Sequence, residues 1–470
     1  MINNYSKSRL PTLLLLITLF FSACSKEIVF ADSSLIGATA SNEEVNTWIY
    51  KTMSEYYLWS DSMPSKDVTN LSLAPMDYFY TVLYKYKNVD RFSWIDANSV
   101  NLINKLNGIN TMLGIKVNMF TNTAIADRNV FVIACVFKDS PADTAGLKRG
   151  DIIMSVNGSA ITSTNYATIL NDQELILGMG KLNGSTFEPL PVSLNKKITK
   201  RTVQVKPILN ETILDYGSKK IGYFAYLQFL KDFDNELRAV FSRFKIAGIN
   251  ELVIDLRYNG GGYVSSSDLL TNLIVNPSNV GKIMNKKVFN KTIPADYKTD
   301  SVTLFEGQAD NIGNKLERVF VLTSNNTASA SELIINNLKP YMEVILIGEN
   351  TYGKNVGSNT LIDSKKRYPY GLQPITFKIL NSAGQSDYGT VAGFTPQYVV
   401  MDTTLPYYQF GDPNETYLKK ALTIVGVDLT NRISSLVRVK KIGFSRLQKM
   451  TISDNQELDR IDMWADPIKN

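Results

Sequence analysis

The chain has 470 residues, of which 44% are hydrophobic and 20% charged, an ordinary globular composition with room for two to four domains. With 16 prolines, 28 glycines and two cysteines, it is not a collagen, a disordered chain or a disulfide scaffold. It has no histidine, which excludes a Ser-His-Asp triad, a Cys-His dyad and a histidine-ligated zinc protease site. The net charge of +6 is scattered, so nucleic acid is not an expected partner.

Residues 1–23 are predicted to be a signal peptide. Lys7 and Arg9 precede the apolar stretch Leu10–Phe21, which at twelve residues is shorter than the about 20 that a membrane span needs. Ser22-Ala23-Cys24 resembles the lipobox of bacterial lipoproteins. The resemblance implies a lipid on Cys24, a tether over residues 24–40, and a place in the cell envelope, on the periplasmic side of the outer membrane or at the cell surface. The alternative is a plain secretory signal in which the cysteine is coincidental.

Residues 41–107 show a helical, aromatic-rich pattern, with Trp48, Tyr57 and Tyr78 among the aromatic residues. This pattern predicts a small N-terminal helical domain with an aromatic core. The strand-like run 130–137 that follows contains Cys135, which we expect to be a buried core thiol.

Residues 108–207 contain two glycine-punctuated segments. Met112-Leu113-Gly114-Ile115 precedes a strand-like run, and residues 140–158 read as a short helix, a Gly-Asp turn, an apolar strand and an Asn-Gly hairpin turn. The combination resembles a circularly permuted PDZ domain of the kind found in bacterial proteases, β-rich with helices. The resemblance implies that the backbone N–H groups of Leu113, Gly114 and Ile115 bind the C-terminal carboxylate of a peptide, which adds a strand to the sheet edge. The alternative is a hairpin that binds nothing.

Residues 208–429 alternate between strand and helix patterns, which predicts an α/β core. Three strand-like runs are each followed by a polar, glycine-rich segment: Glu251–Arg257 by Tyr258–Gly262, Val319–Thr323 by Ser324–Glu332, and Val344–Ile347 by Gly348–Lys354. The second and third runs form a β-α-β unit, so we expect parallel strands whose carboxyl ends bring these segments together. Ser329 should lie at a helix start, where free N–H groups favour an oxyanion.

Each of these segments alone is weak evidence, because a serine before a helix is usually a cap and a triple glycine is usually a turn. Together, Asp255–Gly262, Thr327–Glu332 and Thr351–Lys354 resemble the motifs of the C-terminal processing peptidases, serine peptidase family S41. Asp90–Ile95, Lys220–Tyr223 and Gly411–Pro413 extend the likeness over residues 42 to 428. It implies a multidomain α/β protein whose peptidase core resembles the ClpP/crotonase-like fold.

The resemblance also implies the site residues. Ser329 would be the nucleophile and Lys354, 25 residues later, its base. The oxyanion hole would be the backbone N–H of Ala330 with that of Gly261 or Gly262. Ser358 stands where many members have a glutamine that orients the lysine, and a serine reaches less far. Lys354 should be neutral because it follows an apolar strand and would lie under Tyr352.

The sequence therefore predicts a lipid-anchored serine endopeptidase that needs no metal or cofactor and cleaves unfolded or flexible protein C-termini. A catalytically silent PDZ-type binding lipoprotein is the alternative. A surface component of glycan or nutrient uptake is a third possibility, but only the predicted lipidation favours it. Residues 430–470 are mixed and basic, and the sequence assigns them no role.

Overall fold

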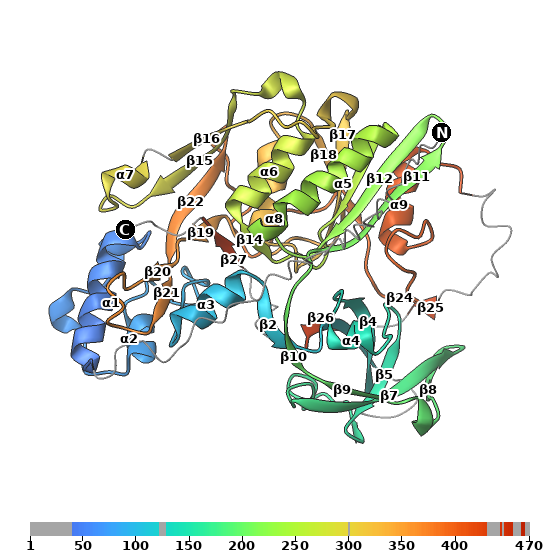
Figure 1. Ribbon diagram of the computed structural model, residues 1–470, viewed down its shortest axis with the longest axis horizontal. Coiled ribbons are helices and arrows are strands. Elements are labelled where there is room, and N and C mark those ends of the chain that lie inside the picture. The colour runs from blue at the N-terminus through green and yellow to red at the C-terminus, as the bar shows by residue number, and fades with distance from the viewer. Residues whose placement is uncertain are drawn as a thin grey trace, which may run out of the picture. The chain divides into compact units, whose positions relative to one another are not determined.

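The computed structural model describes residues 40–121, 128–298, 301–429, 442–443, 446–454 and 462–465 (Figure 1). The predicted signal peptide, Cys24 and nearly all of the tether lie outside the described residues. Within the described ranges no helix is both long and apolar enough to cross a membrane.

The N-terminal segment is helical and aromatic, as predicted. A Ser41–Glu44 capping box starts α1 (Asn42–Tyr56), and Asn98 caps the start of the last helix. Tyr57, Tyr78 and Phe79 are fully buried in one apolar cluster. The remaining elements of this segment are η2 (Ser60–Ser62), η3 (Lys66–Val68), α2 (Pro75–Thr81), β1 (Trp94–Asp96) and α3 (Ser99–Leu106).

The next segment forms a sheet in the order β26-β3-β4-β5-β7-β8. Its strands are β3 (Ile115–Thr121), β4 (Asn129–Val136), β5 (Ile152–Val156), β7 (Glu174–Asn183), β8 (Thr186–Pro189) and β26 (Arg446–Ser453), with β6 (Ser159–Ala160), β9 (Lys196–Thr199), α4 (Pro141–Thr144) and η4 (Val192–Leu194) around them. β2 (Ile109–Met112) pairs with β10 (Arg201–Gln204). Cys135 is fully buried, as expected. The edge strand β26 comes from the C-terminal extension, which the sequence did not indicate.

The core sheet has the order β11-β12-β13-β17-β18-β23, and the strands from β12 to β23 are parallel. The β17-α8-β18 unit therefore has the predicted parallel strands. The strands are β11 (Ile208–Tyr216), β12 (Lys219–Tyr226), β13 (Glu251–Asp255), β17 (Arg318–Thr323), β18 (Glu343–Gly348) and β23 (Tyr398–Val399), and the helices are α5 (Asp234–Ala247), α6 (Val264–Ile274), α8 (Ala330–Leu338) and α9 (Thr416–Val425).

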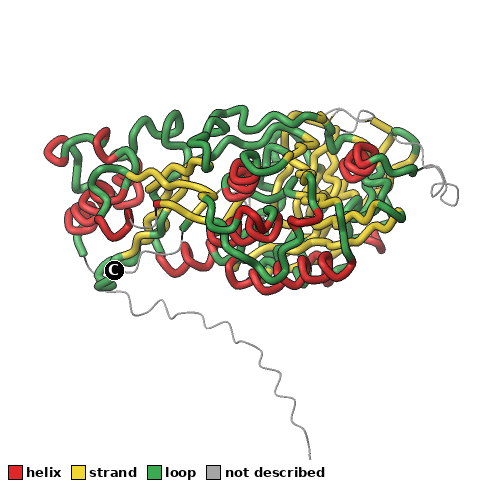
Figure 2. The backbone as a smooth tube through the Cα atoms, turned by 90° about the horizontal axis from the view of Figure 1, so that it is seen from above, coloured by secondary structure: helices red, strands yellow, loops and turns green. Residues whose placement is uncertain are grey.

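Both faces of this sheet carry buried apolar side chains. Ile254 packs with α5, α6 and α8, whereas its neighbour Val253 packs with α9, because successive strand residues point to opposite faces. Figure 1 shows α5, α6 and α8 gathered on one side, and Figure 2 shows the view turned by 90°. The sheet is thus covered by helices on both faces, and its carboxyl ends carry the polar segments.

A second sheet lies beside these carboxyl ends, in the order β14-β27-β19-β22-β15-β16. Its members are β14 (Gly261–Tyr263), β15 (Ile283–Phe289), β16 (Val302–Leu304), β19 (Val356–Ser358), β22 (Ile375–Asn381) and β27 (Asp462–Trp464). The shorter elements are η5 (Lys231–Phe233), η6 (Pro277–Asn279), α7 (Ala295–Lys298), η8 (Gly313–Lys315), β20 (Leu361–Ile362), β21 (Gly371–Gln373), β24 (Thr404–Leu405) and β25 (Ile442–Gly443). The C-terminal extension therefore also supplies an inner strand, β27, next to the glycines of β14.

Candidate active site

Ser329 occupies the N-cap position of α8, at the helix start where it was predicted, with backbone angles φ 65° and ψ −116°. A positive φ is uncommon for a residue with a side chain and costs about 1–3 kcal/mol, so the surrounding contacts must hold it. The residue is fully buried, and among the described residues its Oγ has no hydrogen-bond partner. A hydroxyl without a hydrogen-bond partner, on a residue with a strained backbone at the positive end of a helix, is suited to nucleophilic attack on a substrate rather than to capping.

Glu332 ties the Ser329 segment to the Lys354 segment. Its Oε2 accepts hydrogen bonds from the backbone N–H groups of Ser329 (2.7 Å) and Lys354 (2.9 Å). Its Oε1 accepts from the Gly353 N–H (2.7 Å) and the Thr351 hydroxyl (2.6 Å). Burial raises the pKa of Glu332 to about 7, against the lowering effect of these four donors. One carboxylate thus fixes the helix start next to the loop that carries the lysine.

Lys354 is fully buried, and its Nζ lies 4.7 Å from the centroid of the Phe92 ring. Tyr352, which was expected to cover the lysine, lies against the same Phe92 ring, with ring centroids 6.2 Å apart. Arg91 holds this arrangement, because its Nη2 donates to the carbonyl oxygen of Gly353 (2.8 Å). The segment before the PDZ domain therefore forms part of the wall of the site.

The two candidate oxyanion glycines differ in their contacts. The Gly261 N–H donates to Asn259 Oδ1 at 2.9 Å, so it already has an acceptor. Gly262 has φ +137°, and a Cβ on it would come within 2.2 Å of the carbonyl oxygen of Phe229. Only glycine fits this close approach. Ala330 is the first residue of α8, and its carbonyl oxygen accepts from Ser267 Oγ at 2.9 Å.

Two further serines lie close to the dyad candidates in the sequence. The Ser331 hydroxyl donates to the carbonyl oxygen of Asn259 (3.1 Å), which is a structural contact. Ser358 Oγ is buried and makes no hydrogen bond within the described part of the chain. The structure therefore does not show the lysine-orienting contact suggested for Ser358, and that role stays a hypothesis.

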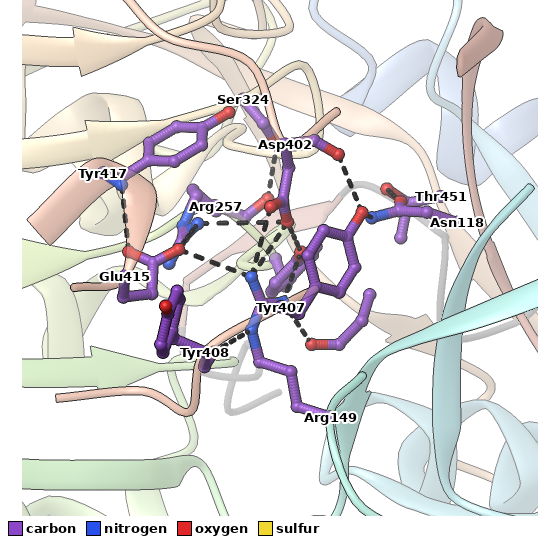
Figure 3. A network of polar contacts seen from close by, with 12 residues as sticks. Asn118, Arg149, Arg257, Ser324, Asp402, Tyr407, Tyr408, Glu415, Tyr417 and Thr451 are labelled. Carbon is purple, nitrogen blue, oxygen red and sulfur yellow. Dashed lines mark hydrogen bonds and ion pairs between the residues drawn. The ribbon is translucent and has the colours of Figure 1, made fainter. Parts of the chain in front are cut away.

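A buried ionic network anchors the loop that leads to these glycines (Figure 3). Arg257 pairs with Asp255 (2.6 Å) and Glu415 (2.8 Å). Arg149, from the predicted PDZ domain, pairs with Asp402 (3.1 Å). Burial acts to raise the pKa of Asp402, but the two arginines outweigh it and the pKa lies below its ordinary value. Because an unpaired buried charge is costly, the network fixes the Asp255–Gly262 segment and links it to the PDZ sheet.

The predicted peptide-binding loop does hold a carboxylate. The N–H groups of Leu113 (2.5 Å), Gly114 (3.0 Å) and Ile115 (2.8 Å) all donate to the side-chain carboxylate of Asp454. Gly114 has φ +89°, and a Cβ there would meet Ser140 Cβ at 2.2 Å. The loop therefore has the geometry of an anion site, and the anion is supplied by the chain's own C-terminal extension.

A cleft of about 460 Å³ opens beside the site, and Arg91, Thr351 and Tyr352 are among its lining residues. Neither Ser329 nor Lys354 lines it. Gly261 and Gly262 are themselves paired in parallel with β27 of the C-terminal extension.

Sequence reasoning missed two contributors to this site. Glu332 was noted only as part of a motif, although its place three residues after Ser329 is the signal of a capping box that can also reach a second segment. Phe92 was noted only within the segment Asp90–Ile95, because its contact with Lys354 joins parts of the chain more than 250 residues apart.

Comparison with known proteins supports one family over much of the chain. The family model for peptidase family S41 matches residues 220–400, the model for the peptidase S41 N-terminal domain matches 44–94, and a PDZ domain model matches 132–179. The domain boundaries given above remain predictions.

Related proteins and structures agree with these matches. A probable CtpA-like serine protease of Staphylococcus aureus (strain N315) is 26% identical over 337 residues, which cover 70% of this chain and 60% of the relative. A probable CtpA-like serine protease of Staphylococcus epidermidis is 25% identical over 229 residues, which cover 47% of this chain and 42% of the relative. The chain thus spans about 60% or less of the length of these relatives.

Among solved structures, a putative S41 protease from Bacteroides fragilis is similar with a TM-score of 0.67 and 28% identity, covering 81% of this chain and 97% of that one. The motif segments that the sequence singled out lie together at the carboxyl ends of the core strands, within the range matched by the peptidase model. Residues 220–400 therefore form a domain of peptidase family S41, and the same chain carries that family's N-terminal domain at 44–94 and a PDZ domain at 132–179.

Proposed function

We propose that this protein is a serine endopeptidase of the C-terminal processing type, with Ser329 as nucleophile and Lys354 as general base. The observation that carries the proposal is the single carboxylate of Glu332, which binds the backbone N–H of both residues and so holds them beside each other. Productive catalysis needs this kind of fixed geometry between nucleophile and base.

In the proposed reaction, Ser329 Oγ attacks the carbonyl carbon of the scissile bond and its proton passes to Lys354 Nζ. The oxyanion is held by the N–H of Ala330 and of Gly262, which is favoured over Gly261 because the Gly261 N–H is engaged by Asn259. Collapse of the intermediate expels the amine, which takes the proton from Lys354. A water molecule, deprotonated by Lys354, then releases the acyl group and restores Ser329.

We further propose that the PDZ loop selects the free C-termini of unfolded or flexible proteins and that a lipid on Cys24 anchors the enzyme in the cell envelope. Support for the first point is the carboxylate geometry at Leu113–Ile115. Support for the second is the lipobox-like sequence at Ser22–Cys24. Mass spectrometry of the mature N-terminus tests the anchor, since a lipoprotein must begin with a modified Cys24.

The test of the activity is cleavage of an unfolded protein by matched serine variants. We expect Ser329→Ala and Lys354→Ala to abolish cleavage and Ser331→Ala to retain it, because the Ser331 hydroxyl only contacts Asn259. Thermal unfolding of each variant checks that the fold is kept. Full activity of folded Lys354→Ala would overturn the dyad, and no cleavage by any form would favour the silent PDZ-type binding protein.

A further inference from the structure

The C-terminal extension docks on the PDZ sheet in the manner of a peptide ligand. β26 pairs antiparallel with β3, the strand that follows the carboxylate loop, with Ser453 opposite Lys116 and Ile452 opposite Val117. Ile452 enters the apolar cluster of the PDZ domain. The extension thus supplies both the added strand and the side chain that such a groove takes from a peptide.

Asp454 ends this strand where a peptide's C-terminus would lie. It is 2% exposed, and three consecutive backbone N–H groups converge on its carboxylate. Its own N–H donates to the carbonyl oxygen of Ile115 (3.3 Å), and its carbonyl oxygen accepts from Lys200 Nζ (3.3 Å). The side-chain carboxylate therefore replaces a terminal carboxylate in the loop.

A second part of the same extension crosses the candidate active site. β27 pairs in parallel with β14, with Gly261 opposite Asp462 and Gly262 opposite Met463. On its other side it pairs with β19, and the Ala465 N–H donates to the carbonyl oxygen of Ser358 (3.0 Å). β27 fills the space between the candidate oxyanion glycines and the strand that follows Lys354, so it completes the sheet as a bound peptide would.

Two side chains of β27, those of Met463 and Trp464, are buried. Met463 is fully buried against Val264, Leu333, Phe377 and Ile379, and Leu333 lies one helical turn after Ser329. Trp464 is 3% exposed and packs on Tyr263, with ring centroids 5.1 Å apart. An apolar pocket next to the nucleophile thus holds a side chain of this chain.

We propose that residues 446–454 and 462–465 act together as a tethered pseudosubstrate: the first segment occupies the PDZ groove and the second lies along Gly261 and Gly262, so that the enzyme is inhibited until a substrate C-terminus displaces them. The effect on rate rests on the proposed peptidase function, whereas the occupancy of the two sites does not. The pocket around Met463 also indicates that a displacing substrate places an apolar side chain beside Leu333.

The physical consequence is competition within one molecule. A tethered ligand acts at an effective concentration on the order of millimolar, so a free peptide must bind better or be abundant to replace it. Removing a competitor that binds the same sites lowers the apparent KM and leaves kcat unchanged. A segment needed for catalysis would instead lower kcat when removed.

The experiment compares the full chain with a chain ending at residue 429, and with two point variants that act at opposite ends of the extension. Asp454→Asn removes the charge in the PDZ loop, and Met463→Lys puts a charge into the apolar pocket. Glu174→Gln is the matched control, because it removes an exposed carboxylate of the same PDZ sheet. If the shortened chain does not fold, the two point variants still test the proposal.

The first readout is cleavage of an unfolded protein. We expect the shortened chain to have a KM lower by roughly ten- to hundredfold at unchanged kcat, as the loss of charge-assisted hydrogen bonds implies. Asp454→Asn and Met463→Lys should lower KM by smaller factors, and Glu174→Gln should have no effect. A synthetic amidated peptide of residues 446–465 should inhibit the shortened chain competitively. Equal KM values for all forms would overturn the proposal.

The second readout does not depend on catalysis. In the Ser329→Ala background, a fluorescent peptide with a free C-terminus should bind the shortened chain at least tenfold more tightly than the full chain. If the shortened chain binds the peptide more tightly but no form cleaves the protein, the peptidase function is wrong and the docking of the extension stands. If both chains bind the peptide equally and cleavage is active, the peptidase function stands and the docking proposal is wrong. Intact-mass analysis completes the test: loss of the extension from the active protein but not from Ser329→Ala would show that it is a substrate, which also overturns the inhibitor proposal.

Discussion

Two buried carboxylates each gather several backbone N–H groups in this protein, and they differ in what surrounds them. Glu332 lies in the first turn of α8, three residues from Ser329, and binds four donors from its own helix start and the Thr351–Lys354 loop. Asp454 binds three donors of the PDZ loop, but it belongs to an edge strand from the far end of the chain.

The contrast separates a fixed carboxylate from a replaceable one. Removing Glu332 takes away the acceptor that four buried donors share. When Asp454 leaves, water or a peptide carboxylate can take its place at the sheet edge. A carboxylate that accepts several backbone hydrogen bonds is therefore a fixed structural contact in one site and occupies a ligand site in the other.

The largest expected effect comes from Glu332→Ala. Its four donors lose their acceptor inside the protein, so we expect a loss of unfolding free energy on the order of 3–5 kcal/mol and a fall in kcat of roughly a hundredfold or more. Asp454→Ala should lower the free energy of unfolding by no more than about 1 kcal/mol. Denaturant unfolding measures the stability loss and single-turnover cleavage measures the rate, with Glu343→Ala at an exposed position as the control. Similar stability losses for the two variants would contradict the comparison.

The second prediction concerns the pH dependence of stability through Glu332. Burial raises its pKa from 4.5 to about 7 in the folded state. Folding therefore favours the protonated form: the stabilisation from this group is fully present below about pH 4.5 and is lost as the pH rises through about 7. At 1.36 kcal/mol per unit, the total change is about 3 kcal/mol.

Glu332→Gln removes this titration and is the matched variant for it. The difference in unfolding free energy between the native protein and Glu332→Gln should change, in favour of the variant, as the pH rises from about 4.5 to about 7. A difference that stays constant over that range would mean that Glu332 keeps an ordinary pKa, so that its four donors fully offset the cost of burial.

The third prediction sharpens the comparison at the PDZ loop. In the chain ending at residue 429, amidation of a substrate's C-terminus should weaken recognition roughly ten- to hundredfold, since it removes a charge-assisted contact to the N–H groups of Leu113–Ile115. In the full chain the loss should be smaller, because Asp454 competes for the same donors. Cleavage rates of paired free-acid and amidated substrates measure it. Equal rates in the shortened chain would show that the loop is only structural.

These two sites also show what a sequence can predict. The place of Ser329 at a helix start followed from a strand run and a helix pattern on either side of it, which are local signals. The parallel strands β17 and β18 followed from the helix between them. Segments such as Thr351–Lys354 could be placed at the sheet's carboxyl ends for the same reason.

The sequence could not predict contacts between residues that lie far apart in the chain. Lys354 contacts Phe92, and Asp454 contacts a loop about 340 residues before it. Each depends on strand register and packing that no local pattern encodes. Residues 430–470 therefore gave no prediction, although their strands reach both sites.

The smallest expected effect distinguishes two buried hydroxyls near the dyad. Ser358 Oγ has no hydrogen-bond partner in the described part of the chain, whereas Ser267 Oγ donates to the carbonyl oxygen of Ala330. Ser358→Ala removes a buried polar atom that gains nothing in the fold, so stability should stay within about 0.5 kcal/mol of the native value or rise slightly. Ser267→Ala should lower the free energy of unfolding by about 1 kcal/mol or more, because the carbonyl oxygen of Ala330 loses this donor.

Kinetics then settle the role suggested for Ser358. If this serine orients Lys354 in the complex with substrate, Ser358→Ala must lower kcat by tenfold or more and move the pH profile of kcat/KM, while the fold stays intact. We expect instead less than a threefold change in kcat and an unmoved profile, since the hydroxyl is unpartnered. Such a result would leave the positioning of Lys354 to Glu332, Arg91 and Phe92, which hold its backbone and cover its side chain.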